Sequence, residues 1–239
     1  MKFSHLSRIY STESLLENQT IKIIEDDFHY LKSVMRLRRS ELFRMFNAVD
    51  GEYLVKVLEI GRSDLTIMVE SFLRPVASVK QLSLAMCMIK SDRMIEAIKG
   101  AVQLGVTRII PIISERTQNN RLAKDRVKRC ILQAIEQSER FVLTELLPEI
   151  SLFEFCSNNN YEQIITACES EISNKKILNI NKIKDNPVIL VGPEGGFSDT
   201  EILMIKESKN TQIVSLGNSV LRAETAAIAA ISCVTMMRN

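Results

Sequence analysis

The sequence predicts an α/β protein whose parallel sheet is preceded by a smaller domain of β-strands. From residue 82 onward, short apolar runs without polar alternation, typical of strands buried on both faces, alternate with helical patterns. Two of these runs stop at a glycine and restart as a helix, in residues 188–198 and 212–226. Near the N-terminus, turn signals instead separate strand-like runs directly from one another.

The N-terminal domain is expected to be a small β-barrel. A short helix is predicted around residues 28–35, and strands are predicted at 42–47, 53–60 and 65–72. Asp50-Gly51 is a favoured hairpin turn between the first two strands, and residues 61–64 supply the next turn. Because proline interrupts regular structure and the pattern changes after it, Arg74-Pro75 is the predicted boundary between domains of residues 1–74 and 75–239.

The C-terminal domain is expected to alternate strands with helices. Strands are predicted at residues 82–89, 108–113, 163–168, 188–191 and 212–216, and helices at 92–104, 123–141 and 226–237. Gly105 is the expected C-cap of the first helix. The last helix is apolar on nearly all sides, so it must be covered either within one subunit or at a dimer interface. It is too short to cross a bilayer.

The glycine-rich loop after the strand at 188–191 is the strongest candidate for a ligand site. Gly192, Gly195 and Gly196 lack a Cβ, so a ligand can lie against backbone N–H groups. Ser198 and Glu201 form a predicted capping box, and parallel sheets bind ligands at the carboxyl ends of their strands. The spacing matches neither of the common phosphate-binding glycine motifs, and Glu194 would repel a phosphate. A ligand with hydroxyls, an amine or a positive centre fits better.

The paired C-terminal motifs resemble those of the ribosomal RNA small subunit methyltransferase E family, in the SPOUT class of knotted methyltransferases. The motifs are Gly192-Pro193-Glu194-Gly195-Gly196-Phe197-Ser198 and Leu216-Gly217-x-x-Val220-Leu221-Arg222-x-Glu224-Thr225-Ala226. Further blocks agree in order, at residues 29–36, 90–94, 104–111, 114–117 and 134–140. The chain departs from the family pattern at Ser219, where arginine is usual, at Gln103, where glutamate is usual, and at residues 39–41.

The resemblance implies a fold, an activity and partners. It makes residues 1–74 a PUA-like RNA-binding domain and residues 75–239 a knotted methyltransferase domain. The implied reaction transfers a methyl group from S-adenosylmethionine to N3 of a uridine in 16S rRNA of the small ribosomal subunit, giving 3-methyluridine and S-adenosylhomocysteine without a metal. The family's homodimers favour a dimer interface for the last helix.

Site residues follow from the same resemblance. The catalytic candidates are Arg222, for the developing uracil anion or a phosphate, and Glu194 and Glu224, for proton removal or for the cofactor's amine. Arg116 and Arg140 are secondary candidates. The cofactor is assigned to three strand ends: Thr166, Ala167, Cys168 and Glu169; Val191, Gly192, Glu194, Gly195 and Gly196; Leu216, Gly217, Ser219, Val220, Leu221, Glu224, Thr225 and Ala226.

The distribution of charge is more informative than the net charge of +2. Residues 116–129 are strongly basic, which is typical either of a solvated helix face or of a phosphate-binding surface. The resemblance favours the second interpretation. The predicted RNA-binding residues are Arg36, Arg38, Arg39, Arg116, Arg121, Lys124, Lys128 and Arg129.

Other classes of protein are disfavoured. The five cysteines have no metal-binding spacing and are odd in number, and the two histidines are far apart, so neither a metal site nor a disulfide framework is expected. No signal peptide is recognised, and a cytoplasmic protein is expected. Two alternatives stay open: another knotted RNA methyltransferase, acting on a ribose 2′-hydroxyl or a tRNA base, and a non-catalytic rRNA-binding assembly protein. A nicotinamide-dependent oxidoreductase is disfavoured by the glycine spacing.

Overall fold

The computed structural model describes residues 3–117, 121–158, 160–168 and 175–238. The chain forms two compact units, one comprising Met1–Ser78 with Glu139–Val142 and the other comprising Val79–Ser138 with Leu143–Asn239. The short segment Glu139–Val142, which returns to the N-terminal unit, was not predicted from the sequence.

The N-terminal unit is a mixed five-stranded sheet in the order β1-β3-β4-β5-β2. Its elements are β1 (Arg8–Tyr10), β2 (Thr20–Ile24), α1 (Glu25–His29), a π-helical turn at Tyr30–Val34, β3 (Leu42–Asn47), β4 (Gly51–Ile60) and β5 (Asp64–Arg74). β1 runs parallel to β3, and the other neighbours are antiparallel. The expected barrel is open, because β1 and β2 do not pair with each other in the described part of the chain.

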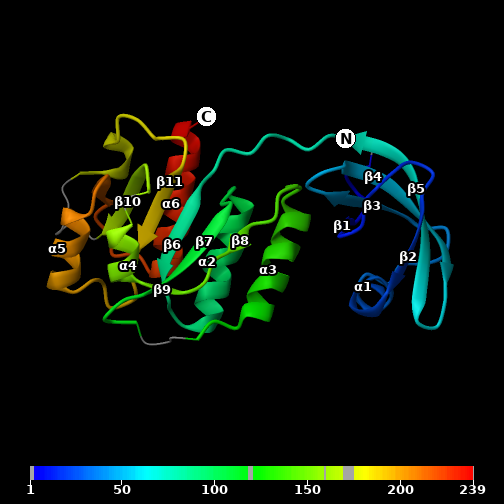
Figure 1. Ribbon diagram of the computed structural model, residues 1–239, viewed down its shortest axis with the longest axis horizontal. Helices are drawn as coiled ribbons and strands as arrows, with labels where there is room; N and C mark the ends of the chain where they lie inside the picture. Colours follow the sequence, from blue (N-terminus) through cyan, green and yellow to red (C-terminus); the bar gives the residue numbers. More distant parts are fainter. Residues whose placement is uncertain (1–2, 118–120, 159, 169–174, 239) are drawn as a thin grey trace. The chain divides into compact units, whose positions relative to one another are not determined.

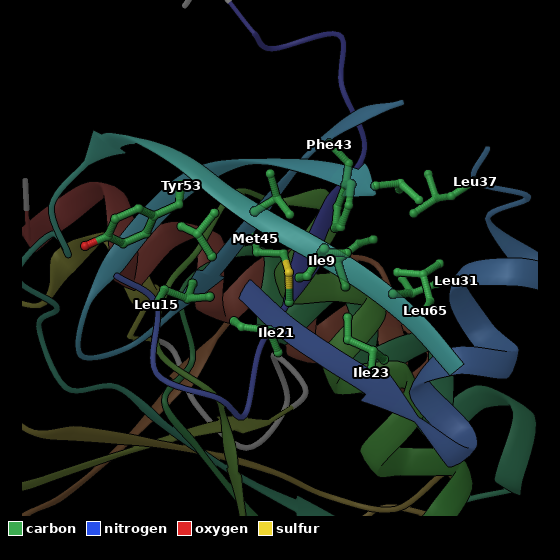
Figure 2. Close-up of a cluster of buried hydrophobic side chains, with 14 residues drawn as sticks. Ile9, Leu15, Ile21, Ile23, Leu31, Leu37, Phe43, Met45, Tyr53 and Leu65 are labelled. Carbon is green, nitrogen blue, oxygen red and sulfur yellow. The ribbon is translucent and has the colours of Figure 1, made fainter. Parts of the chain in front are cut away.

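Alternation of side chains places the core of this unit on one side of the sheet. In β2, Ile21 and Ile23 are buried while Thr20, Lys22 and Ile24 are exposed. Figure 2 shows side chains from all five strands and from the helical segment meeting in this cluster, with Leu31 and Leu37 closing one end. The N-terminal unit therefore has a hydrophobic core of its own.

A cluster of charged side chains ties the return segment to this sheet. Glu52 of β4 is fully buried and pairs with Arg8 at 3.2 Å, with Arg44 at 2.9 Å and with Arg74. Glu139 of the return segment also pairs with Arg44, at 2.9 Å, and with Arg74, at 3.0 Å.

Aromatic rings complete the cluster. The Arg8 guanidinium lies 3.3 Å from the centre of the Phe46 ring and 5.1 Å from that of Phe141, which belongs to the return segment. Burial lowers the pKa of Arg8 to about 10, against the opposing effect of Glu52.

The C-terminal unit is built on a seven-stranded parallel sheet in the order β12-β10-β11-β6-β7-β8, with β9 also paired to β7. Its strands are β6 (Ser83–Cys87), β7 (Arg108–Ile113), β8 (Glu145–Leu146), β9 (Ile150–Ser151), β10 (Gln163–Cys168), β11 (Pro187–Val191) and β12 (Thr211–Ser215). Its helices are α2 (Ser91–Gln103), α3 (Lys124–Gln137), α4 (Leu152–Ser157), α5 (Asp199–Glu207) and α6 (Ala223–Arg238), with a 3-10 turn at Ile177–Asn179.

Helices cover both faces of this sheet. Leu152 and Phe155 of α4 and Ile202 and Ile205 of α5 form one cluster with alternate residues of β6, β7, β10 and β11. On the other face, α6 packs on β10, β11 and α2, and α2 packs on α3 (Figure 1). Gly100 allows the close approach of α2 to α6, because a Cβ there would lie 2.8 Å from the Ile228 side chain. Among the described residues, none of the helices is long and apolar enough to cross a membrane.

The long basic helix is shorter than predicted. α3 ends at Gln137, four residues before the expected end at 141. The Ser138 hydroxyl donates to the carbonyl of Ala134, and Glu139 has a φ of 57°, which a helix cannot accommodate. The sequence pattern extended the helix to Phe141 because an apolar residue at that position fits the buried face of an amphipathic helix. Phe141 is indeed buried, but it belongs to the N-terminal unit.

Candidate active site

A pocket of about 520 Å³ lies at the carboxyl edge of the parallel sheet in the C-terminal unit. Three of its walls are the segments that follow the adjacent strands β10, β11 and β12, and two arginines of other segments complete it. The lining residues are Arg93, Arg116, Ala167, Cys168, Val191, Gly192, Pro193, Glu194, Gly195, Gly196, Phe197, Leu216, Gly217, Ser219, Val220, Leu221, Arg222, Ala223 and Ala226. The pocket is in the size range of small-molecule sites.

The glycine loop after β11 is held by a capping box, as the sequence predicted. The Ser198 hydroxyl accepts from the Glu201 amide, and Glu201 accepts in return from the Ser198 amide at 2.9 Å. The other carboxylate oxygen of Glu201 accepts from the Glu115 amide at 2.8 Å. The buried Glu201 therefore fixes both the start of α5 and the turn that carries Arg116.

Arg116 holds the same loop from the side. Its guanidinium donates to the Gly195 carbonyl at 2.8 Å and to the Phe197 carbonyl at 3.4 Å. Two bonds from one planar group restrict the orientation of two peptide units. Arg116 was predicted as an RNA-binding residue and as a secondary catalytic candidate, and its contacts give it a further role in shaping the pocket.

Arg93, at the start of α2, links the two motif loops. It donates to Glu194 of the glycine loop at 2.9 Å, and its Nε lies 4.0 Å from a carboxylate oxygen of Glu224, in the first turn of α6. Glu224 is buried, and its other carboxylate oxygen has no hydrogen-bond partner within the described residues. The sequence block 90–94 supported the family resemblance, but no site role was predicted for Arg93.

The loop after β12 supplies the third wall. The Ser215 hydroxyl accepts from the Gly217 amide at 3.2 Å and donates to the Gly217 carbonyl at 3.0 Å, which closes a tight turn. Gly217 has a φ of 138°, a conformation that L-residues rarely adopt. The loop then runs through Ser219, Val220 and Leu221, all exposed and all lining the pocket, to Arg222.

Most of the predicted cofactor residues meet in this one pocket. Those that line it are Ala167, Cys168, Val191, Gly192, Glu194, Gly195, Gly196, Leu216, Gly217, Ser219, Val220, Leu221 and Ala226. Thr166 is fully buried in β10, Glu224 is buried, Thr225 is exposed, and none of the three lines the pocket. Glu169 lies outside the described residues. Pro193, Phe197 and Ala223 were missed although each neighbours a predicted residue.

The catalytic candidates differ in their surroundings. Arg222 is exposed at the pocket, and no side-chain partner of its guanidinium is found among the described residues. Glu194 is held by Arg93, and Glu224 is buried beside it. Arg140 is not among the pocket-lining residues, and burial lowers its pKa. Within the described part of the chain, no group of His, Cys, Asp and Glu side chains is placed to hold a metal ion.

The predicted RNA-binding residues are all exposed: Arg116 lies in the turn after β7, Arg121 lies just before α3, and the others lie on α3 or in the N-terminal unit. On α3, Lys124 pairs with Glu149 and Arg126 pairs with Asp92, whereas no acidic partner of Lys128 or Arg129 is found among the described residues. In the N-terminal unit, Arg36, Arg38 and Arg39 are exposed around the segment between the π-helical turn and β3. Arg39 also donates to the Leu58 carbonyl at 3.1 Å.

Two family models match the chain. Residues 77–235 match an RNA methyltransferase domain, and residues 23–70 match an RNA methyltransferase PUA domain. The fold and the pocket thus define an RNA methyltransferase with an N-terminal PUA domain, and the predicted fold class is confirmed.

Curated relatives narrow the assignment. Ribosomal RNA small subunit methyltransferase E of Rickettsia conorii is 37% identical over 234 residues, which cover 97% of this chain and 96% of the relative. The protein of the same name from Buchnera aphidicola subsp. Schizaphis graminum is 27% identical, with 95% and 94% covered. The chain belongs to the ribosomal RNA small subunit methyltransferase E family, as the sequence motifs predicted.

Solved structures agree with this assignment. The family member from Neisseria gonorrhoeae bound to S-adenosyl methionine superimposes with a TM-score of 0.80, at 29% identity, with 95% of this chain and 96% of that chain covered. A Legionella pneumophila protein solved with the cofactor SAM has the same fold, with a TM-score of 0.86 at 24% identity and 97% of each chain covered.

Proposed function

We propose that this protein transfers a methyl group from S-adenosylmethionine to N3 of a uridine in 16S rRNA of the small ribosomal subunit. The observation that carries the proposal is the pocket of about 520 Å³, in which the two motif loops meet at the carboxyl ends of β11 and β12. Parallel sheets bind ligands at this edge. Membership of the ribosomal RNA small subunit methyltransferase E family supplies the substrate class.

The residues of the pocket fit S-adenosylmethionine. Glycine backbone and the side chains of Val191, Leu216 and Leu221 suit an adenosine moiety, and Glu194 suits a cationic group. When bound, the cofactor supplies an electrophilic methyl group on a sulfonium. The protein's contribution is orientation, which can account for roughly 7–11 kcal/mol of a reaction barrier.

The rest of the chemistry is assigned to three side chains. Arg222 is exposed at the pocket, and it is proposed to stabilise the negative charge that develops on the uracil. Glu194 and Glu224 are proposed for removal of the imide proton or for binding the amine of the cofactor. The target uridine must be unstacked to reach a pocket between loops, which favours a single-stranded or splayed segment of RNA.

The wider organisation follows from the same proposal. Residues 1–74 are proposed to bind RNA and residues 75–239 to hold the cofactor and carry the reaction. α6 exposes Met236 and carries many small side chains, so it is proposed as the interface of a homodimer. Because the proposed substrate belongs to the ribosome, the protein is proposed to work in the cytoplasm.

The direct test combines cofactor binding with nucleoside mapping. Isothermal titration with S-adenosylmethionine is expected to show saturable binding. Small ribosomal subunits that lack 3-methyluridine, incubated with protein and cofactor, are expected to gain this nucleoside in their 16S rRNA by mass spectrometry. Methylation at a ribose or of tRNA would redirect the proposal to another reaction of the same class, and RNA binding without cofactor binding would favour an assembly protein.

Arg222→Gln is expected to separate binding from catalysis. The guanidinium has no hydrogen bond or ion pair to another side chain among the described residues, so the fold and the cofactor affinity should be retained. Loss of one donor to a developing negative charge lowers a rate by about 10²–10³. Single-turnover methylation rates and titration of the same preparation measure both quantities. An unchanged rate would remove Arg222 from the reaction.

Lys128→Ala combined with Arg129→Ala is expected to weaken RNA binding in a salt-dependent way. Each phosphate contact contributes roughly 0.7–0.9 to the slope of log affinity against log salt, so the slope should fall by about 1.4–1.8. Arg126→Ala is the matched control on the same helix, because its guanidinium already pairs with Asp92 at 2.8 Å. Equal slopes for the double variant and the wild type would exclude these residues from the RNA interface.

A further inference from the structure

The Arg93–Glu194 ion pair is a distinct feature of the pocket wall. Both residues line the pocket, and their side chains are 31% and 29% exposed, so the pair is neither buried nor fully solvated. Glu194 is the one carboxylate among the described lining residues. A positive and a negative group therefore lie side by side, 2.9 Å apart, facing a ligand-sized cavity.

The other two arginines of the pocket do not offer the same arrangement. Arg116 donates to the carbonyls of Gly195 and Phe197, and no acidic partner of its guanidinium is found among the described residues. Arg222 has no acidic partner among the described residues. In the described part of the pocket, a paired cation and anion thus occur at Arg93 and Glu194.

Both members of the pair have hydrogen-bonding capacity left. A guanidinium carries five N–H donors, and one nitrogen of Arg93 is bonded to Glu194 while Nε faces Glu224 at 4.0 Å. Two carboxylates, those of Glu194 and Glu224, lie near the guanidinium of Arg93. One oxygen of the buried Glu224 also lacks a hydrogen-bond partner among the described residues. The surroundings of Arg93 can therefore accept an additional cation.

We propose that Arg93 and Glu194 form a subsite for an α-amino acid zwitterion, the methionine end of S-adenosylmethionine. The α-carboxylate is bound by Arg93, and the α-ammonium is bound by Glu194. This inference rests on the proposed function, since it concerns the same pocket and cofactor. It assigns the adenosine end to the glycine backbone and apolar side chains after β11 and β12, where no second ion pair is present among the described residues.

The subsite can be tested by varying the ligand and the protein together. The ligands are S-adenosylmethionine, its decarboxylated analogue, which lacks the carboxylate, and 5′-methylthioadenosine, which lacks the whole amino acid end. For the wild type, removal of the carboxylate is expected to weaken binding about tenfold or more, as for other charge-assisted hydrogen bonds. Arg93→Gln should reduce the affinity for S-adenosylmethionine by a similar factor, but should reduce the affinity for 5′-methylthioadenosine by less than about threefold.

Arg116→Gln is the matched control. It removes a guanidinium that holds the loop, so it should weaken S-adenosylmethionine and 5′-methylthioadenosine by the same factor. If Arg93→Gln also weakens both ligands equally, Arg93 only shapes the loop and the subsite is wrong, while the proposed function stands. If the wild type binds the decarboxylated analogue as tightly as S-adenosylmethionine, the proposed subsite is wrong, and this result needs no variant. If the wild type binds none of the ligands, the proposed function fails together with the subsite.

Discussion

Gly192→Val is expected to reduce the affinity for S-adenosylmethionine by on the order of 100-fold or more. A Cβ at Gly192 would lie 2.9 Å from Cε2 of Phe197 and 3.2 Å from two further ring atoms. The ring cannot move aside easily, because Phe197 is only 8% exposed and packs in the cluster between β11 and α5. Overpacking of this kind costs about 1–3 kcal/mol for small groups, and valine adds two methyl groups beyond the Cβ. The strain should displace the loop that forms one wall of the pocket.

Gly195→Ala is the matched control in the same loop. A Cβ there would lie 3.5 Å from Cδ of Arg116, which is ordinary van der Waals contact, and Gly195 does not have the left-handed conformation of Gly196 and Gly217. Its affinity is expected to stay within about threefold of the wild type. Isothermal titration measures both variants, and thermal unfolding shows whether each remains folded. Wild-type affinity in a folded Gly192→Val protein would mean that this loop is not part of the cofactor site.

The contrast between these glycines shows what the sequence could and could not predict about the site. The motif placed all the loop glycines at one sheet edge, because strands buried on both faces and a capping box are local patterns. It could not rank Gly192 above Gly195, since the difference depends on where the Phe197 ring packs. Arg93 was missed for a similar reason. Its partners Glu194 and Glu224 are 101 and 131 positions away in the sequence, and their segments meet through the parallel pairing of β6 with β11 and the packing of α2 on α6.

In the fold too, the elements that depend on local sequence patterns were predicted, and those that depend on distant contacts were missed. The predicted strands at 42–47, 108–113 and 163–168 are observed with the same bounds. β1 and β2 were not predicted, because runs of three and five residues give too little periodicity. The end of α3 was misplaced because a buried Phe141 looks alike in sequence whether it packs on its own helix or in another unit.

Glu52→Gln is expected to destabilise the N-terminal unit by about 3–5 kcal/mol, the usual cost of leaving buried charges without their partner. Glu52 is fully buried and is the shared partner of Arg8, Arg44 and Arg74. Glutamine keeps the shape of the side chain but removes its charge and replaces one acceptor with a donor. Arg8 would lose most, because its guanidinium lies over the Phe46 ring and near the Phe141 ring, and burial already lowers its pKa to about 10.

Urea unfolding followed by tyrosine fluorescence is the appropriate measurement. The chain has no tryptophan and four tyrosines, and Tyr10, Tyr30 and Tyr53 belong to the N-terminal unit. The signal therefore reports mainly on that unit. Glu70→Gln is the matched control in the same sheet, because its pair with Lys56 is 4.0 Å long and partly exposed, a type worth at most about 1 kcal/mol.

The loss of unfolding free energy in Glu52→Gln also shows how much the segment Glu139–Val142 stabilises the N-terminal unit. Glu139 offers Arg44 and Arg74 a second carboxylate, at 2.9 Å and 3.0 Å, and its side chain is about one-third exposed. If Glu139 can replace Glu52, the loss in Glu52→Gln should be no larger than in Glu70→Gln, and the buried cluster would not stabilise this unit. If it cannot, Glu52→Gln and Glu139→Gln should show a coupling free energy of about 0.5–3 kcal/mol in a double-mutant cycle, because they share two arginines. We expect the second result, since Glu52 is buried and pairs with Arg8 as well as with the two arginines that Glu139 contacts.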